Sequence, residues 1–234
     1  MCGRFSLTKE EAEIEKRFQA KFYTNDLVKR YNVAPSQLSL VMTDAQPDQL
    51  QLFKWGLIPS WAKDKTIGYK MINARSETVF EKPSFKKLIK QRRCLVIADS
   101  FYEWQPLGGK KKQPFRIGLK SWDLFAFAGL WDEWAEKETG EIVPTFTILT
   151  TAANSLVAPI HDRMPVILEP EEEKLWLKKG INDQEILELL TPFPESEMMV
   201  YPVSEQVNSP ANDNPAIIEP VSYTHLTLPT SDLV

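Results

Sequence analysis

Four strand-like segments follow one another with no helix between them, and this run limits the fold more than any other feature of the sequence. Residues 92–105 (RRCLVIADSFYEWQ) begin as a buried strand and end in polar residues, and the turn GGKKKQP joins them to a strand at 114–119. Two further stretches rich in aromatic and β-branched residues follow at 122–134 and 143–153. Consecutive strands joined by short turns pair antiparallel. The sequence therefore predicts a largely antiparallel sheet here.

The expected helices lie outside this run rather than between its strands. Thr8 and Glu11 have the spacing of a capping box, and Ile14, Phe18 and Phe22 follow at four-residue steps on one face. Further helices are expected over 84–90, over 150–158 up to Pro159, from Pro170 to Gly180, and from a capping box at Asn182 and Glu185 to Leu190. Because strands outnumber helices and do not alternate with them, we expect an α+β fold rather than a doubly wound sheet.

Length and cysteine content narrow the class of protein. The 234 residues, 43% of them hydrophobic, suffice for one core. No apolar run approaches the length of a membrane span, and the polar, acidic start is unlike a secretory signal. The two cysteines, Cys2 and Cys94, make no disulfide framework, so we expect a reducing compartment: the cytoplasm, with nucleoid association in a bacterium. We interpret Cys94 as a core thiol.

The net charge of -4 argues against a protein that coats nucleic acid by bulk electrostatics. Any contact with nucleic acid has to depend on a local patch. Two basic stretches are candidates, although a solvated helix face and a charged turn explain them at least as well: Lys86, Lys87, Lys90, Arg92 and Arg93, and then Lys110, Lys111, Lys112 and Arg116.

The last stretch, VSYTHLTLPTSDLV, looks foreign to the rest of the chain. Val221–Thr230 can be back-translated into a transposase end followed by a sequencing adapter, so we expect the natural chain to end near Pro220. On this interpretation, residues 2–220 form one domain and 221–234 are a non-native, disordered tail. His225 is then set aside, which leaves His161 as the histidine of interest.

Cys2 directly follows the initiator methionine, which is an unusual place for a buried structural thiol because chain starts are commonly exposed. Methionine before a small residue is normally removed. Cys2 would then carry a free α-amine beside its thiol, forming a 1,2-aminothiol. An incidental cysteine at this position remains an alternative.

Polar residues that follow apolar or aromatic runs are the other candidates for chemistry. Asn73 could orient a reactive group or cap a turn, and Glu103, between two aromatic residues, could be a general acid–base or an outward-facing strand residue. His161 could be a base or a structural histidine. Arg75 and Arg163 could bind phosphates or form surface ion pairs. Trp55, Trp61 and Trp104 could stack on bases or belong to the core.

Seven motifs occur in an order that resembles one family. They are MCGRF, RYNVAP, WGLIPSWA, INARSET, FYEW, KKQPF and IHDRMP, and a closing YPVSEQVN and IIEP extend the match to about Pro220. The sequence resembles the SRAP domain family, the SOS-response-associated peptidases or abasic-site processing proteins. The resemblance implies a single α+β domain of curved or barrel-like sheets with flanking helices. It also implies recognition of abasic sites in single-stranded DNA, protection of the lesion in the DNA damage response, and a thiazolidine crosslink through the terminal cysteine.

The resemblance also assigns roles by motif. It implies that Cys2 is the nucleophile, that Asn73 positions its amine, that Glu103 is the general acid–base and that His161 stabilises developing charge. It implies backbone-phosphate contacts for Arg4, Arg75 and Arg163, and a stacking or wedge role for Trp55. The family's peptidase label refers to removal of residues before the cysteine; here only Met1 precedes it, so an ordinary aminopeptidase suffices.

Two other classes of function stay open at this point. A terminal cysteine with its own amine as base is also found in N-terminal-nucleophile amidohydrolases or peptidases. A module that binds single-stranded DNA without a covalent bond, with an incidental Cys2, is the second alternative. We expect no cofactor and no metal, because one histidine and two distant cysteines lack the spacing of zinc ligands. We also expect a monomer with no membrane contact.

Overall fold

A computed structural model describes residues 2–22 and 29–221 of the chain, and its strands form two sheets. The smaller sheet has the strand order β14-β9-β8-β1-β3. Its strands are β1 (Phe5–Leu7), β3 (Arg30–Val33), β8 (Ser100–Pro106), β9 (Lys112–Leu119) and β14 (Met198–Pro202). All of its pairings are antiparallel. The expected tail at 221–234 lies outside the described residues, apart from Val221.

The larger sheet has nine strands and follows the order β12-β11-β10-β7-β4-β5-β2, with β13 beside β10 and β6 beside β11. Its strands are β2 (Lys21–Phe22), β4 (Leu38–Thr43), β5 (Gln46–Trp55), β6 (Asn73–Arg75), β7 (Arg93–Ala98), β10 (Phe125–Ala135), β11 (Ile142–Ala152), β12 (Arg163–Pro165) and β13 (Ile167–Leu168). Among the described strands of this sheet, only the pairings of β2 with β5 and of β11 with β5 and β6 are parallel. The expected α+β fold with largely antiparallel sheets is therefore confirmed.

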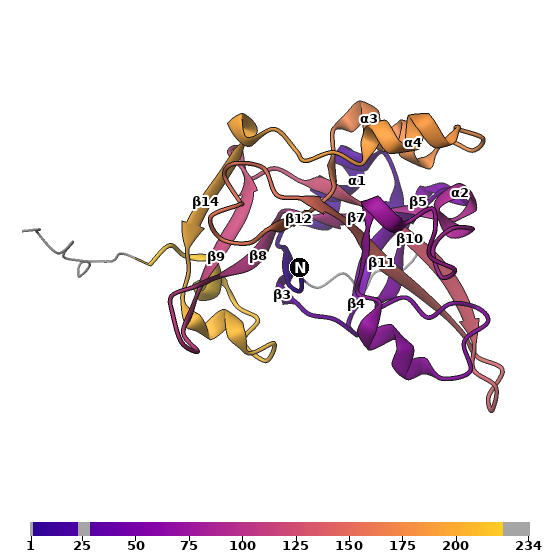
Figure 1. The fold of residues 1–234 in the computed structure, drawn as a ribbon, viewed down its shortest axis with the longest axis horizontal. Helices are drawn as coiled ribbons and strands as arrows, with labels where there is room; N and C mark the ends of the chain where they lie inside the picture. Colours follow the sequence, from indigo (N-terminus) through magenta and orange to yellow (C-terminus); the bar gives the residue numbers. More distant parts are fainter. Residues whose placement is uncertain (1, 23–28, 222–234) are drawn as a thin grey trace, which may run out of the picture.

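The helices cover one side of the larger sheet, with α3 and α4 along its top in Figure 1. The helices are α1 (Glu11–Phe18), α2 (Leu88–Gln91), α3 (Pro170–Leu177) and α4 (Asp183–Leu189), with short 3₁₀ turns η1 (Lys65–Lys70), η2 (Ser76–Thr78), η3 (Glu195–Glu197), η4 (Glu205–Asn208) and η5 (Pro215–Ile218). The capping box at Asn182 and Glu185 is confirmed. None of the described helices is long and apolar enough to cross a membrane.

Two expected helix boundaries are wrong, and one expected helix is absent from the described residues. The first helix is capped by Glu10 and Glu13 rather than Thr8 and Glu11, because the Thr8 hydroxyl donates instead to Asp99. The helix expected over 84–90 is confined to α2. The helix expected over 150–158 does not form: β11 continues to Ala152, and the residues up to 160 are turns.

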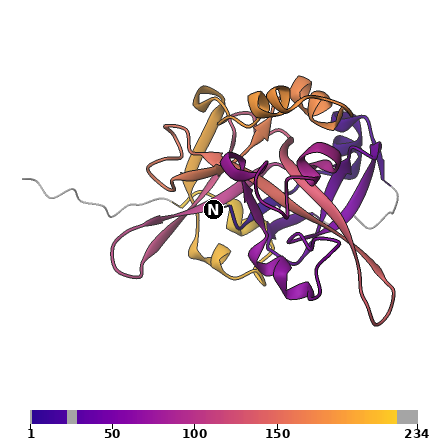
Figure 2. The same ribbon diagram turned by 45° about the vertical axis from the view of Figure 1, so that its right-hand side comes forward.

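Each face of the larger sheet has its own core. The helices pack on one face, against side chains such as Leu95 and Ile97 of β7. The smaller sheet packs on the other face, against Cys94 and Val96 of the same strand. Both faces of β7 are therefore buried, which explains its continuous apolar sequence and confirms Cys94 as a core thiol. The start of the described chain lies between the two groups of strands (Figures 1 and 2).

Candidate active site

Cys2 lies at the edge of the layer between the two sheets. Its side chain is 0% exposed and belongs to the core that joins the sheets. The backbone after Cys2 is hydrogen-bonded to β8: the Tyr102 amide donates to the Arg4 carbonyl at 2.9 Å, and Phe5 pairs with Phe101. The Asn73 side chain donates from Nδ2 to the Cys2 carbonyl at 2.7 Å. Two elements far apart in sequence therefore fix the Cys2 backbone.

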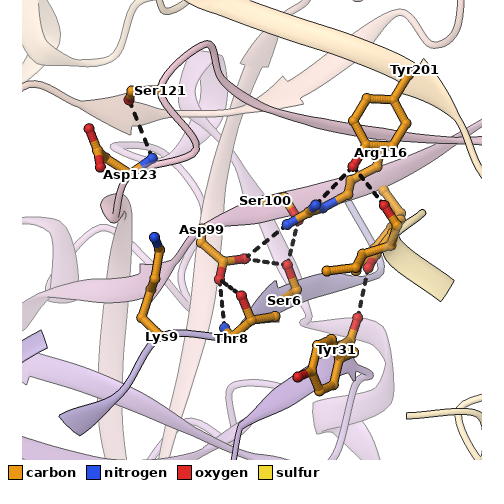
Figure 3. A network of polar contacts seen from close by, with 12 residues as sticks. Ser6, Thr8, Lys9, Tyr31, Asp99, Ser100, Arg116, Ser121, Asp123 and Tyr201 are labelled. Carbon is orange, nitrogen blue, oxygen red and sulfur yellow. Dashed lines mark hydrogen bonds and ion pairs between the residues drawn. The ribbon is translucent and has the colours of Figure 1, made fainter. Parts of the chain in front are cut away.

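A buried carboxylate fixes where β1 lies along β8. Asp99 accepts hydrogen bonds from the amide and the hydroxyl of Thr8, both at 2.6 Å, and from the hydroxyl of Ser6. The Arg116 guanidinium lies 3.7 Å from this carboxylate and donates to Ser100 Oγ at 2.8 Å (Figure 3). A slip of one residue would turn every side chain of the strand to the opposite face. The carboxylate therefore sets the register that leads back to Cys2.

The same residue marks an unforeseen break in the segment expected as one strand at 92–105. Residue Asp99 separates β7 from β8, and these two strands belong to different sheets. The chain thus passes from the larger to the smaller sheet directly before Glu103. This crossing places Glu103 of the smaller sheet near residues carried by the larger one.

Asn73 begins β6, which pairs in parallel with β11, where Asn73 lies opposite Ile148. The preceding residue is held as well, because Trp55 donates from its indole nitrogen to the Ile72 carbonyl at 2.9 Å. The Oδ1 atom of Asn73 is buried and accepts no hydrogen bond from the described residues. The amide can therefore hold the Cys2 carbonyl with one end and accept from an amine with the other.

Glu103 is a buried carboxyl in β8, with 2% of its surface exposed. Burial raises its pKa to about 7. Burial also raises the pKa of the Cys2 thiol, and the negative charge of Glu103 adds to that rise. The two groups are therefore close enough to influence each other's ionisation. A carboxyl that titrates near neutrality can both donate and accept protons during one reaction.

His161 follows the turns that end β11 and precedes β12. Its Nδ1 atom accepts a hydrogen bond from the Arg163 amide at 3.0 Å and lies 2.9 Å from a carboxylate oxygen of Asp162. Burial lowers the pKa of His161, and the side chain of Asp162 is 85% exposed, so we assign the neutral ring. With Nδ1 accepting, the proton is assigned to Nε2. His161 can then act as a neutral hydrogen-bond donor.

The three arginines expected to bind phosphates differ in their surroundings. Arg4 is 9% exposed and donates to Asn32 Oδ1 at 2.6 Å and the Val207 carbonyl at 2.7 Å. Arg163 forms a bidentate pair with Glu77 at 2.6 and 3.0 Å. The Arg75 side chain is exposed and makes no ion pair or hydrogen bond within the described part of the chain, although its charge acts on nearby Glu77. Arg75 is therefore the one of the three whose guanidinium is ready for a phosphate without exchange of partners.

The stacking role expected of Trp55 does not agree with its burial. Trp55 is 1% exposed, lies parallel to the ring of Phe146 at a centroid distance of 6.3 Å, and contacts Phe5 at 5.0 Å. Its position at the end of β5, where β5 meets β11, places the indole in the core between the sheets. No face of this ring is open to a base in this structure, so a stacking or wedge role for Trp55 would require the core to open, and that role stays a prediction.

Two other aromatic side chains are exposed in the connection between β5 and β6. Trp61 is 60% exposed and Tyr69 is 66% exposed. The connection has defined anchors, because the Ser60 amide donates to buried Asp132 at 2.7 Å and the Ile58 amide donates to Thr145 Oγ1 at 2.9 Å. Sequence reasoning named Trp61 only as one of three tryptophans and missed Tyr69. Their position in a Pro- and Gly-containing connection, outside any strand, was the available signal.

No cluster of three or more His, Cys, Asp or Glu side chains suited to a metal ion occurs among residues 2–22 and 29–221. The candidate site consists of the chain's own groups at the edge between the sheets: Cys2, Asn73, Glu103 and His161. Asn73 is hydrogen-bonded to Cys2, the charge of Glu103 acts on the Cys2 thiol, and Gln105 of β8 is hydrogen-bonded to Pro159 in the turn before His161.

Comparison with known proteins agrees with the motif order. The family model described as SOS response associated peptidase (SRAP) matches residues 1–210. The abasic site processing protein YoqW of Bacillus subtilis (strain 168) is 50% identical over 223 residues, covering 94% of this chain and 99% of the relative. The abasic site processing protein HMCES of Gallus gallus is 36% identical over 202 residues, covering 76% of this chain and 59% of that protein.

A solved structure also matches the fold. The crystal structure of a protein from Bacteroides thetaiotaomicron superimposes with a TM-score of 0.87 at 33% sequence identity, covering 94% of this chain and all of that one (100%).

Proposed function

The chain belongs to the SRAP family, and from this premise we propose that it senses abasic sites in single-stranded DNA and bonds to them covalently through Cys2 after removal of Met1. The observation that carries the proposal is the hydrogen bond from Asn73 to the Cys2 carbonyl, together with the Glu103 carboxyl, whose pKa burial raises to about 7. The relatives named above as abasic site processing proteins support the choice of lesion.

The first step is attack by the Cys2 α-amine on the aldehyde carbon of the ring-opened deoxyribose. An α-amine has a pKa of about 7.7–8.0, so part of it is neutral and nucleophilic near pH 7. The adduct is a carbinolamine. Protonated Glu103 gives its proton to the hydroxyl of this intermediate, water leaves, and an iminium remains opposite the Glu103 carboxylate. His161 donates from Nε2 to the sugar oxygen on which charge develops.

The second step closes the ring. The Cys2 thiol gives its proton to the Glu103 carboxylate, and the sulfur attacks the iminium carbon to form a five-membered thiazolidine. Glu103 ends protonated, as it began, and the net reaction releases one water. Burial raises the pKa of the Cys2 thiol, and this rise determines the order of the two steps. Because a buried neutral thiol is a poor nucleophile, the amine reacts first.

Incubation with single-stranded DNA that contains one abasic site tests the proposal. We expect a band that survives denaturation in the gel, is absent with Cys2→Ala, and persists with Cys94→Ala, the control for the second thiol. No surviving band with protein whose Met1 is removed would rule out the covalent function. A band that survives Cys2→Ala would point to an adduct through an amine alone, either the retained α-amine or a lysine. Hydrolysis of small amides without retained DNA would favour the amidohydrolase alternative.

We also propose that Trp61 and Tyr69 provide the stacking surface that Trp55 does not. Replacing both by Ala should weaken binding to intact single-stranded DNA by at least roughly 5–150-fold, since the loss of even one stacked base costs on the order of 1–3 kcal/mol. Fluorescence anisotropy measures this affinity. Ile142→Ala, which removes another exposed apolar side chain (56% exposed), is the control and should change affinity less than about twofold. Equal affinities for the double variant and the control would contradict the assignment.

A further inference from the structure

The two basic stretches of the sequence differ in how their charges are used. In the first stretch, Lys90 pairs with Asp183 at 2.7 Å and Arg92 with Glu133 at 3.2 Å. Arg93 is 1% exposed and donates to three main-chain carbonyls at 2.6–2.9 Å. Much of this stretch therefore serves the fold rather than a ligand.

The lysines of the second stretch lie at the turn between β8 and β9, whereas its Arg116 is buried within β9. Gly108 and Gly109 have positive φ values of 95° and 58°, which suit glycine and shape the turn. Lys110, Lys111 and Lys112 follow, all exposed, and their ammonium groups have no ion pair with any described residue. The turn lies beside a hollow of about 580 Å³ lined by Trp104, Lys110, Lys111, Lys112, Glu205 and Asn208.

The hollow adjoins β8, the strand that carries Glu103, on the face opposite the Glu103 side chain, because consecutive strand residues point to opposite faces. Trp104 directly follows Glu103, its indole nitrogen donates to Asn208 at 2.7 Å, and its ring lies 5.9 Å from the Arg4 guanidinium carbon. The neighbouring Gln105 donates to the Pro159 carbonyl at 3.0 Å, which ties β8 to the turn before His161. The charge of Lys112 is one of the influences that lower the pKa of His161, after burial.

We propose that Lys110, Lys111 and Lys112 bind the backbone phosphates of the single-stranded DNA that flanks the abasic site. The proposal rests on the proposed function. Three ammonium groups against one carboxylate, Glu205, give the hollow a local excess of positive charge in a chain whose net charge is -4. Phosphodiesters fit this excess, and the hollow is near enough to the candidate active site for the charge of Lys112 to act on His161.

Two variants of equal charge test the inference. The first replaces Lys110, Lys111 and Lys112 by Gln. The matched control makes the same change at Lys82, Lys86 and Lys87, which also have no ion pairs among the residues described. Both lower the net charge by the same amount, so a general electrostatic effect would be equal in the two. Affinity for intact single-stranded DNA is measured between about 50 and 200 mM salt.

We expect the slope of log binding constant against log salt concentration to become shallower in the turn variant, by about 0.7 for each phosphate that is no longer neutralised. Binding at low salt should weaken by about 10-fold or more. The protein concentration for half-maximal crosslinking to abasic DNA should rise by a similar factor. Equal behaviour of the two variants would overturn the inference, provided that thermal melting shows both folded. A different result would contradict the proposed function alone. In that case the wild type forms no crosslink, while the turn variant, unlike the control variant, still loses affinity for intact DNA.

Discussion

A protein with one extra residue between Met1 and Cys2 is expected to form no stable adduct with abasic DNA. Inserting Glu there keeps the methionine in place and converts the Cys2 nitrogen into an amide, which does not condense with an aldehyde. The yield of denaturation-resistant adduct should fall by at least about 10³-fold, the scale on which loss of an acting nucleophile is felt. A denaturing gel measures the yield, and mass spectrometry verifies the N-terminus.

The matched variants separate the roles of nitrogen and sulfur. Cys2→Ser keeps the amine, so it should give an adduct only when borohydride reduces the imine. A protease site placed directly before Cys2 should restore the stable adduct after cleavage, which shows that the extended protein is folded. A stable adduct from the uncleaved extended protein would contradict the aminothiol mechanism.

Replacing Glu103 by Gln is expected to produce the second-largest loss. The rate of crosslinking should fall by about 10²–10³-fold, because the variant removes the proton donor and acceptor while keeping the shape of the side chain. Gln in the same buried position still accepts hydrogen bonds, so the fold should survive. Single-turnover rates of band formation measure the loss.

The pH dependence distinguishes proton transfer from a structural role. In the wild type, the fraction of neutral amine rises with pH, while the fraction of protonated Glu103 falls as pH passes its pKa of about 7. The product of these fractions gives a bell-shaped profile with a maximum between the two pKa values. With Glu103→Gln the falling limb should disappear, so that the remaining rate rises with pH and levels off above the amine pKa.

The exposed Glu138→Gln is the control, and it should retain both the rate and the bell. A bell that persists in Glu103→Gln would assign the falling limb to another group. A rate unchanged by that substitution would remove Glu103 from the reaction.

Much of the fold followed from local patterns, because strands joined by tight turns pair with their neighbours. The run expected at 92–153 forms β7 to β11, and the apolar sequence of β7 predicted that this strand is buried. The sequence did not predict that this run divides between two sheets at Asp99. This division depends on Thr8 and Ser6, which lie more than ninety positions earlier and reach Asp99 only in the folded chain (separations of 91 and 93).

The sequence identified the types of residue in the candidate site, but it did not show which of them are exposed to solvent. Trp55 and Trp61 occur in one motif, and only the pairing of β5 with β11 decides that the first is buried and the second exposed. The pairing of Arg163 with Glu77 was hidden for the same reason, since the two residues come from different motifs, 86 positions apart. The contact between Asn73 and Cys2 agrees with the positioning role that the motifs imply, and that role stays a prediction until the variants are measured.

The carboxylate that holds Ser6 and Thr8 has a consequence for the gene as well as for the protein. Since it pins the strand a few residues after Cys2, the path from the pinned point back to the reactive atoms has a fixed length. On the proposed mechanism, an in-frame codon gained or lost between Cys2 and that point would move the proposed nucleophile off its target, although the rest of the chain would fold as before. On the proposed mechanism any residue kept ahead of Cys2 blocks its amine, so affinity tags belong at the other end of the chain.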